Sequence, residues 1–246
     1  MKLVSDDGDV FELQLCAPTR PRDALLATYW AMHPRYTFLK SVVPGCNLLD
    51  VGAGSGGLAV WKLWGEPVRD DIRMCAIDLV RGEYFDRYQD FQLIDASRER
   101  TKFADAAFDA AHLSHVVEHV ASLPGLLAEL RRLLKPGGKV YIEWPHPAST
   151  RFPRAQALAE LGILATTVNF FDDLTHVNVL EPRELIARLN DCGFDVLTAG
   201  TITNDGLAPQ LLSYGIDHRD AEITTYGLWL ALRFSTYVIA ELRRAP

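Results

Sequence analysis

Closely spaced cysteines are missing from this sequence. Its four cysteines, Cys16, Cys46, Cys75 and Cys192, lie far apart, which excludes the pattern of a zinc knuckle or a redox pair. Most of them are expected to be small buried residues in a reducing compartment. The first residues, MKLVSDDGDVFELQ, carry acids where a signal peptide needs a basic start, and no apolar run approaches the roughly 20 residues of a membrane span. We therefore expect a cytoplasmic protein that has no contact with a membrane.

An excess of basic residues is missing too. The formal net charge is -7, which argues against nucleic acid as a partner because binding phosphates needs a basic face. No internal repeat or low-complexity linker divides the 246 residues, and an apolar content of 48% is ordinary for a protein with a substantial core. We expect a single domain over residues 1–246, and the sequence leaves the oligomeric state open.

What the sequence does contain is a glycine-rich stretch at residues 48–57, LLDVGAGSGG. An apolar run of strand type ends at Asp50 and Val51, and the helix-compatible segment LAVWKLW begins after the glycines. Glycine lets the backbone adopt positive φ and lets a ligand approach closely, while the start of a helix offers unpaired N–H groups. The stretch predicts a strand, a tight turn and a helix that together form a nucleotide site, although a lone pattern of this kind is also typical of a surface turn.

Segments of strand and helix type alternate after this turn, which is typical of βαβ units and a largely parallel sheet. Strands are expected at residues 73–77, 91–94, 108–113, 139–144, 194–199 and 236–242, and helices at residues 123–134 and 181–192. Residues 1–20 are expected to form a short hairpin or an extended arm, and residues 201–226 to be irregular.

Two segments stand outside this alternation. Residues 22–43 have the pattern of one or two amphipathic helices, interrupted or restarted at Pro34, and are expected to form an N-terminal helical cap. Residues 145–180 are too long for a simple connection. They are expected to be an insertion on the substrate side of the domain, with a short helix near residues 154–161.

The glycines alone leave the nucleotide open. Gly52, Gly54 and Gly57 fit the GxGxxG pattern of an NAD site, and Asp78 lies about where such a fold places the acid that binds ribose. Asp50, however, precedes the first glycine, where a carboxylate would accept bonds from a charged amino group but would lie close to a pyrophosphate. Asp95 ends the third strand in LIDAS, where it can accept a bond from an exocyclic amine.

With the segments FDAAHLSHVVEHV and LLKPGG added, the sequence resembles the class I S-adenosylmethionine-dependent methyltransferases, in particular their small-molecule group. The resemblance covers about residues 47–144 and extends more loosely to residue 194. It implies an α/β fold with a Rossmann-like, seven-stranded, mostly parallel sheet, helices on both faces and an antiparallel last strand. It also implies S-adenosylmethionine as the cofactor.

The resemblance assigns nine residues to the cofactor. They are Asp50 and the backbone of Gly52 and Gly54 for its methionine end, Asp78 and the adjacent Leu79 for the ribose side, Asp95 and Ala96 for the adenine, and Leu113 and Ser114 at the end of strand four. Any one of these acids alone would more often be a helix cap or a turn residue. Their order at successive strand ends favours the site, because ligands bind at the carboxyl ends of the strands in open α/β sheets.

Three histidines are candidates for a base that removes a proton from the methyl acceptor. His115 is expected to open the helix after strand four, His146 follows strand five in WPHP, and His176 lies in the insertion in FFDDLTH. Each has a packing role as its alternative. The segment HVVEH at residues 115–119 also matches the HxxEH pattern of zinc peptidases, in which His115 and His119 would share a helix face. No third ligand is evident, so no metal site is expected.

These patterns together predict a methyltransferase that moves a methyl group from S-adenosylmethionine to an unidentified small-molecule acceptor. Two alternatives stay open at this point. One is an NAD-dependent oxidoreductase of Rossmann type, and the other is a noncatalytic nucleotide-binding protein.

Overall fold

The computed structural model describes residues 1–17 and 19–244, and the chain divides into two compact units. Unit 1 consists of Met1–His33, Pro145–Leu180 and Thr201–Thr236, and unit 2 consists of Pro34–Trp144, Glu181–Gly200 and the residues from Tyr237 onward. The helical segment expected over residues 22–43 is thus shared between the units. The chain leaves unit 1 at His33 and enters unit 2 at Pro34.

Unit 2 is built on a seven-stranded sheet with the order β5-β4-β3-β6-β7-β9-β8. Its strands are β3 (Asn47–Val51), β4 (Arg73–Asp78), β5 (Asp90–Leu93), β6 (Phe108–Ser114), β7 (Leu134–Pro145), β8 (Phe194–Thr201) and β9 (Ser235–Leu242). The ladders from β5 to β7 are parallel, and the last strands of the sheet are antiparallel. The fold class expected from the sequence is therefore confirmed.

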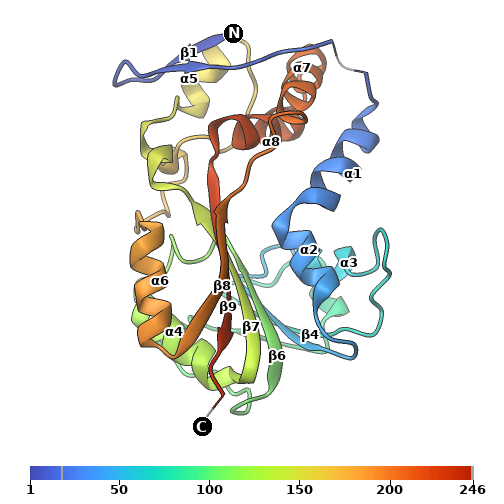
Figure 1. Cartoon of the computed structure of the whole chain (residues 1–246), viewed down its shortest axis with the longest axis vertical. Coiled ribbons are helices and arrows are strands. Elements are labelled where there is room, and N and C mark those ends of the chain that lie inside the picture. The colour runs from blue at the N-terminus through green and yellow to red at the C-terminus, as the bar shows by residue number, and fades with distance from the viewer. Residues whose placement is uncertain (18, 245–246) are drawn as a thin grey trace. The chain divides into compact units, whose positions relative to one another are not determined.

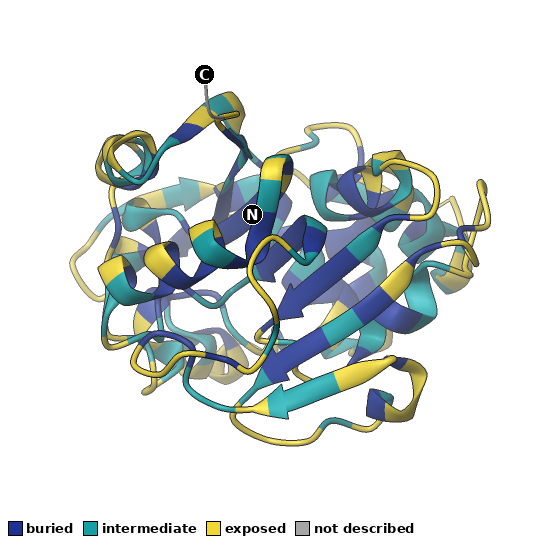
Figure 2. Cartoon of the chain, turned by 90° about the horizontal axis from the view of Figure 1, so that it is seen from below, coloured by how far each residue is buried: buried dark blue, intermediate teal, exposed yellow. Residues whose placement is uncertain are grey.

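Helices cover both faces of this sheet, with α2 and α3 on one face and α4 and α6 on the other (Figure 1). They are α2 (Pro34–Ser41), α3 (Gly57–Trp61), α4 (Leu123–Leu133) and α6 (Pro182–Asp191). The inner strands are almost entirely buried, and the exposed residues lie mainly in the loops (Figure 2). A core of buried side chains on the α2 and α3 face includes Phe38, Leu48, Leu58, Phe85 and Tyr141.

Helix α4 starts where its sequence dictates. Ser122 is the N-cap, and its hydroxyl accepts a bond from the N–H of Gly125, while Pro124 sits in the first turn, where a missing N–H costs nothing. Its leucines face the core, as expected for an amphipathic helix. The chain passes directly from Leu133 into β7, which begins at Leu134 and is longer than the strand expected at residues 139–144.

Unit 1 contains a short antiparallel hairpin and several helices. The hairpin is β1 (Lys2–Val4) and β2 (Val10–Glu12), and the helices are α1 (Arg22–Met32), α5 (Ala155–Glu160), α7 (Ala208–His218) and α8 (Ala221–Leu232), with 3-10 turns at Pro147–Arg151 and Phe170–Asp172. The hairpin at the N-terminus and the short helix in the insertion agree with the sequence analysis. The expectation of an irregular segment at residues 201–226 is wrong, because most of it is helical.

Helices α7 and α8 form because they pack closely against each other. A Cβ on Gly215 would lie 2.3 Å from the Oγ1 of Thr224, and a Cβ on Gly227 would lie 2.8 Å from Leu212. Asp220 caps the second helix by accepting a bond from the N–H of Ile223 at 3.1 Å. Glycine and threonine are weak helix formers, so this tertiary contact outweighs the local propensity that the sequence pattern reports. In the described part of the chain, no helix is both long and apolar enough to cross a membrane.

Candidate cofactor site

The glycine loop, residues 52–57, connects β3 to α3 and adopts a conformation that only glycine accepts easily. Gly52, Gly54 and Gly56 have φ of 67°, 56° and 83°. The N–H of Gly52 donates to the carbonyl of Ile77 at 2.8 Å, which fixes the loop to the end of β4. A Cβ on Gly54 would meet nothing within 4 Å, so this part of the loop faces open space. The loop therefore leaves room for a ligand against the backbone.

Asp78 ties the end of β4 to the glycine loop. Its Oδ2 accepts a bond from the N–H of Gly54 at 2.7 Å, and its Oδ1 accepts from the N–H groups of Leu79 at 2.7 Å and Val80 at 3.1 Å. A carboxylate has about four acceptor sites, two on each oxygen, so Oδ2 can still accept a bond from a hydroxyl. Leu79 and Val80 are 69% and 71% exposed, which is unusual for two consecutive large apolar residues. They give this edge of the sheet an apolar surface.

Asp95 and Ala96 form the turn after β5. The Oδ1 of Asp95 accepts bonds from the N–H of Ser97 at 3.0 Å and from its hydroxyl at 2.6 Å. The Nε of Arg98 lies 3.5 Å from the other carboxylate oxygen, and Ala96 is buried. The carboxylate thus holds its own turn together, and its second oxygen is paired only loosely with an exposed arginine.

Asp50 is buried near the glycine loop, with Tyr88 bonded to it and His112 close by, two residues that the sequence did not point to. The hydroxyl of Tyr88 donates to its Oδ2 at 2.5 Å, and the Nδ1 of His112 lies 3.5 Å from its Oδ1. Burial and the Asp50 carboxylate raise the pKa of Tyr88 far above its usual value, so its hydroxyl stays a donor. The side chain of Asp50 is 5% exposed, which places it inside unit 2 rather than on its surface.

Leu113 and Ser114 end β6, as expected, and the structure places them differently. Leu113 is fully buried, whereas Ser114 is half-buried. The hydroxyl oxygen of Ser114 is enclosed and has no hydrogen-bond partner among the described residues. An unsatisfied enclosed hydroxyl is costly, so Ser114 has spare hydrogen-bonding capacity at the carboxyl end of the strand.

The β6 turn, residues 115–119, replaces the helix start expected there. His115 has φ of 56° and the residues after it form turns, with the next helix beginning only at Leu123. The expectation that His115 opens a helix is wrong, and the shared helix face that the HxxEH pattern requires for His115 and His119 does not form. His115 instead lies between Glu118 and Glu143, at 2.9 Å and 3.1 Å.

The other two candidate histidines belong to unit 1 and not to the unit that holds His115. The Nδ1 of His146 accepts a bond from the N–H of Ala148 at 3.1 Å, at the start of a 3-10 turn. The Nδ1 of His176 lies 2.5 Å from the carbonyl of Phe170, and the His176 ring is almost fully enclosed. A carbonyl only accepts, so Nδ1 of His176 carries the proton and Nε2 holds the lone pair in the neutral ring.

The structure brings most of the nine cofactor candidates to one edge of unit 2. The carboxyl ends of the neighbouring strands β3, β4, β5 and β6 carry, at or just after their last residues, Asp50 with the glycine loop, Asp78, Asp95 and Ser114. Sequence reasoning missed Tyr88, His112 and Gly82. Gly82 leaves no room for a side chain, because a Cβ there would lie 2.1 Å from the carbonyl oxygen of Gly54. A glycine four residues after Asp78 was the only local signal for any of these three.

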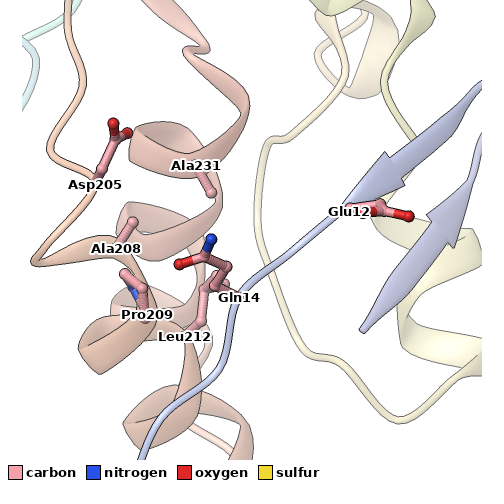
Figure 3. Close-up of a pocket in the computed structure, with 7 residues that line it drawn as sticks. All are labelled: Glu12, Gln14, Asp205, Ala208, Pro209, Leu212 and Ala231. Atoms are coloured by element: carbon pink, nitrogen blue, oxygen red, sulfur yellow. The ribbon is translucent and has the colours of Figure 1, made fainter.

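A pocket of about 200 Å³ lies elsewhere, in unit 1, between the N-terminal segment and helices α7 and α8 (Figure 3). Its lining residues are Glu12, Gln14, Asp205, Ala208, Pro209, Leu212 and Ala231. Ligand pockets usually enclose about 300–1,000 Å³, so this one is small for a nucleotide-sized molecule. Its two carboxylates already have partners, Lys2 at 3.0 Å for Glu12 and the Thr203 hydroxyl at 3.3 Å for Asp205.

The sheet order, the glycine loop and the acids at successive strand ends define a Rossmann-like nucleotide-binding protein of the methyltransferase type. A family model described as a methyltransferase domain matches residues 7–199, so the chain belongs to this family. The predictions of a class I S-adenosylmethionine-dependent methyltransferase, of an enzyme and of its cofactor are thereby confirmed. The alternative of an NAD-dependent oxidoreductase is not supported.

Individual relatives agree with the family. A 2-phytyl-1,4-naphtoquinone methyltransferase of Synechocystis is 34% identical over 108 residues, which cover 41% of this chain and 45% of that protein. A malonyl-acyl-carrier-protein O-methyltransferase of Serratia marcescens is 32% identical over 173 residues, covering 65% and 58%. A methyltransferase structure from Archaeoglobus fulgidus has a TM-score of 0.55 at 18% identity, covers 88% of this chain and 94% of its own, and shows the fold alone. The chain thus spans about half the length of these two curated relatives, 45% and 58%.

Proposed function

We propose that this protein transfers a methyl group from S-adenosylmethionine to a small-molecule acceptor, and that the cofactor binds at the carboxyl ends of β3, β4, β5 and β6. The bond between the Asp78 carboxylate and the N–H of Gly54 carries this proposal, because it joins the first two strand ends into one ligand-facing surface. The family supplies the activity, and its members act on different acceptors, so the acceptor stays open.

The nine residues have distinct roles in this proposal. Asp50 and the backbone of Gly52 and Gly54 hold the methionine end, and Leu79, exposed beside Asp78, packs against the cofactor on the ribose and adenine side. Asp95 and the Ala96 amide read the adenine, while Leu113 and Ser114 lie alongside the cofactor. The exposure of Leu79 supports its role, because removing an exposed apolar side chain from water under a flat ring stabilises the complex.

For methyl transfer, the protein has to align the reactants more than it has to activate them. The sulfonium of the cofactor is already activated, so the site must hold a nucleophile in line with it and remove a proton where the acceptor has one. We assign the base, where one is needed, to His176 rather than to His146 or His115. The bond of its Nδ1 to the carbonyl of Phe170 supports this choice, because it fixes the tautomer of the neutral ring.

Residues of unit 1 select the acceptor in this proposal. The insertion at residues 145–180 is expected on the substrate side of the domain. Helix α1 belongs to the same compact unit as this insertion, which supports a shared role in binding the acceptor. The net charge of -7 favours a small molecule over nucleic acid as the acceptor. A cytoplasmic location is proposed on the ground that Cys16, Cys46, Cys75 and Cys192 are all free thiols.

Ligand binding tests the proposal directly. In thermal unfolding, S-adenosylmethionine and S-adenosylhomocysteine should raise the melting temperature, because a ligand at 100 times its Kd stabilises a protein by about 2.7 kcal/mol. NAD in the same plate should leave the melting temperature unchanged.

Asp78→Ala should weaken S-adenosylhomocysteine binding about tenfold or more, since losing the bonds of a charged group costs about 1.5–3 kcal/mol. Asp86→Ala is the matched control, because Asp86 is an exposed acid that pairs with Arg81 at the surface. No binding of either cofactor form would refute the proposal.

A further inference from the structure

Both ring nitrogens of His115 face carboxylates. Nδ1 lies 2.9 Å from the Oε1 of Glu118, and Nε2 lies 3.1 Å from the Oε1 of Glu143. An ionised carboxylate only accepts hydrogen bonds, and a neutral imidazole has a single N–H to donate. Two such bonds therefore require the doubly protonated imidazolium. Burial opposes this charge, but the bonds from Glu118 and Glu143 outweigh it and raise the pKa of His115 to about 9.

The two carboxylates around His115 are fully buried and differ in their other partners. Glu143 on β7 also accepts a two-pronged interaction from Arg35, at 2.9 Å and 3.2 Å, and a bond from the Tyr141 hydroxyl at 2.7 Å. Glu118 uses its Oε1 for His115, and its Oε2 has no hydrogen-bond donor among the described residues. A buried carboxylate needs a compensating charge, so the imidazolium of His115 matters most to Glu118.

The backbone at His115 is also unusual. Its φ of 56° lies in the left-handed region, which a residue with a side chain adopts only when its surroundings enforce it. The N–H of His115 donates to the carbonyl of Glu143 at 2.8 Å, so both the backbone and the ring of His115 are fastened to the same residue of β7. The side-chain bonds thus hold the β6 turn in a conformation that the free chain would avoid.

This turn contacts the glycine loop through the next residue. The Cγ2 of Val116 lies 2.4 Å from the position where a Cβ on Gly52 would be, so Val116 fills the space that glycine leaves. A shift of the β6 turn would therefore move the side chain that supports the first glycine of the loop. Ser114, with its unpartnered hydroxyl, stands at the other end of the same short segment.

We propose that His115 is a positioning residue for the cofactor: its imidazolium, clamped between Glu118 and Glu143, fixes the β6 turn and thereby holds Val116 against Gly52 of the glycine loop. The inference rests on the proposed function, since it concerns the same cofactor. It assigns His115 a role other than the general base considered from the sequence, because a ring that already carries both protons cannot accept another.

The protonation state is tested on the wild-type protein, without any substitution. In histidine-labelled protein at about neutral pH, nitrogen NMR should show two N–H groups on the His115 ring, assigned by its loss in His115→Gln. A single N–H on that ring would overturn the proposal. His218→Gln is the matched control, because His218 is an exposed histidine that stacks on Tyr214.

The effect on the cofactor is tested by calorimetry with S-adenosylhomocysteine. His115→Gln should weaken binding about tenfold, and His115→Gln combined with Glu118→Gln should recover part of the loss, because the uncompensated buried carboxylate is then gone. Unchanged binding in folded His115→Gln, or no recovery in the double variant, would overturn the proposal.

If wild-type protein binds no S-adenosylhomocysteine, the proposed function fails. The positioning role is then still tested by the amide signals of Gly52 and Gly54, which should shift in His115→Gln and stay in place in His218→Gln.

Discussion

Asp50 and His112 are partners in the parallel ladder of β3 and β6, and the Nδ1 of His112 lies 3.5 Å from the Oδ1 of Asp50. His112 also stacks on Tyr141 of the next strand, with ring centroids 5.2 Å apart. A carboxylate, an imidazole and a phenol ring thus form one buried row across three neighbouring strands. Asp50 precedes the glycine loop by two residues, so the acid that leads into the loop is part of the interior of unit 2.

The bond from Tyr88 to Asp50 gives a first prediction, on stability. Tyr88→Phe should lower the free energy of unfolding by about 1.5–3 kcal/mol, because it removes the donor to a buried charged group and leaves the ring in place. Urea denaturation followed by circular dichroism measures this change. Tyr214→Phe is the control and should change stability by less than about 0.5 kcal/mol, since Tyr214 is a partly exposed ring on α7. Equal effects of the two variants would contradict the prediction.

A second prediction separates backbone strain from ligand contact. Gly54 and Gly8 both have positive φ, 56° and 83°, and a Cβ on either would meet nothing within 4 Å. Alanine at either position should therefore cost a similar amount of stability, about 1–2 kcal/mol. Gly54→Ala should in addition weaken S-adenosylhomocysteine binding at least tenfold in calorimetry, because its new methyl group points into the space proposed for the cofactor. Gly8→Ala should leave binding unchanged, and a parallel loss in both variants would argue against a ligand at Gly54.

A third prediction concerns the exposed apolar surface after β4. Leu79→Ser should weaken binding of S-adenosylhomocysteine by about 5- to 30-fold, because the complex then lacks about 1–2 kcal/mol of apolar burial against the cofactor. Its effect on stability should be small, because Leu79 is 69% exposed in the unliganded protein. Leu174→Ser provides the comparison, since Leu174 is 94% exposed but lies in unit 1. That variant should bind as the wild type does.

The sheet of unit 2 could be predicted from the sequence because its strands and helices are locally consistent. The apolar runs of β4 and β6 end in polar residues, β3 ends directly before the glycine loop, and α4 carries its own start signal in Ser122 and Pro124. Local patterns of this kind report secondary structure wherever the tertiary environment agrees with them.

Two parts of the structure could not be predicted, for different physical reasons. Helices α7 and α8 depend on close contact at Gly215 and Gly227, which are residues that disfavour helices on their own. The β6 turn depends on carboxylates from two elements that meet at His115, one of them Glu143 on a neighbouring strand. A local sequence pattern predicts neither the contact between the two helices nor the carboxylates around His115. It does not predict the bond from Tyr88 to Asp50 either.

The last prediction concerns acid and the network around Glu129, which packs α4 against the loop before β6. Its Oε1 accepts bonds from the N–H and the hydroxyl of Thr101 at 2.9 Å and 2.8 Å, and Arg132 lies 2.6 Å away. Burial would raise the pKa of Glu129, but the bonds from Arg132 and Thr101 outweigh it, so the pKa is lowered. A carboxyl whose pKa is lower in the folded state stabilises the fold above its unfolded pKa of about 4.3 and loses that contribution as the pH falls through the folded value.

Glu129→Gln should therefore cost about 1.5–3 kcal/mol of unfolding free energy at about pH 7. The cost should be smaller at about pH 3.5, because below about pH 4.3 the unfolded wild-type chain takes up a proton at Glu129 more readily than the folded protein does. Urea denaturation at the two pH values measures both differences. Glu184→Gln serves as the control, because Glu184 forms an exposed pair with Arg188 within α6, and such pairs contribute at most about 0.5 kcal/mol at either pH. A difference for Glu129→Gln that stays the same at both pH values would mean that its carboxylate is not held ionised by Arg132 and Thr101. The cost of the variant would then come from packing alone.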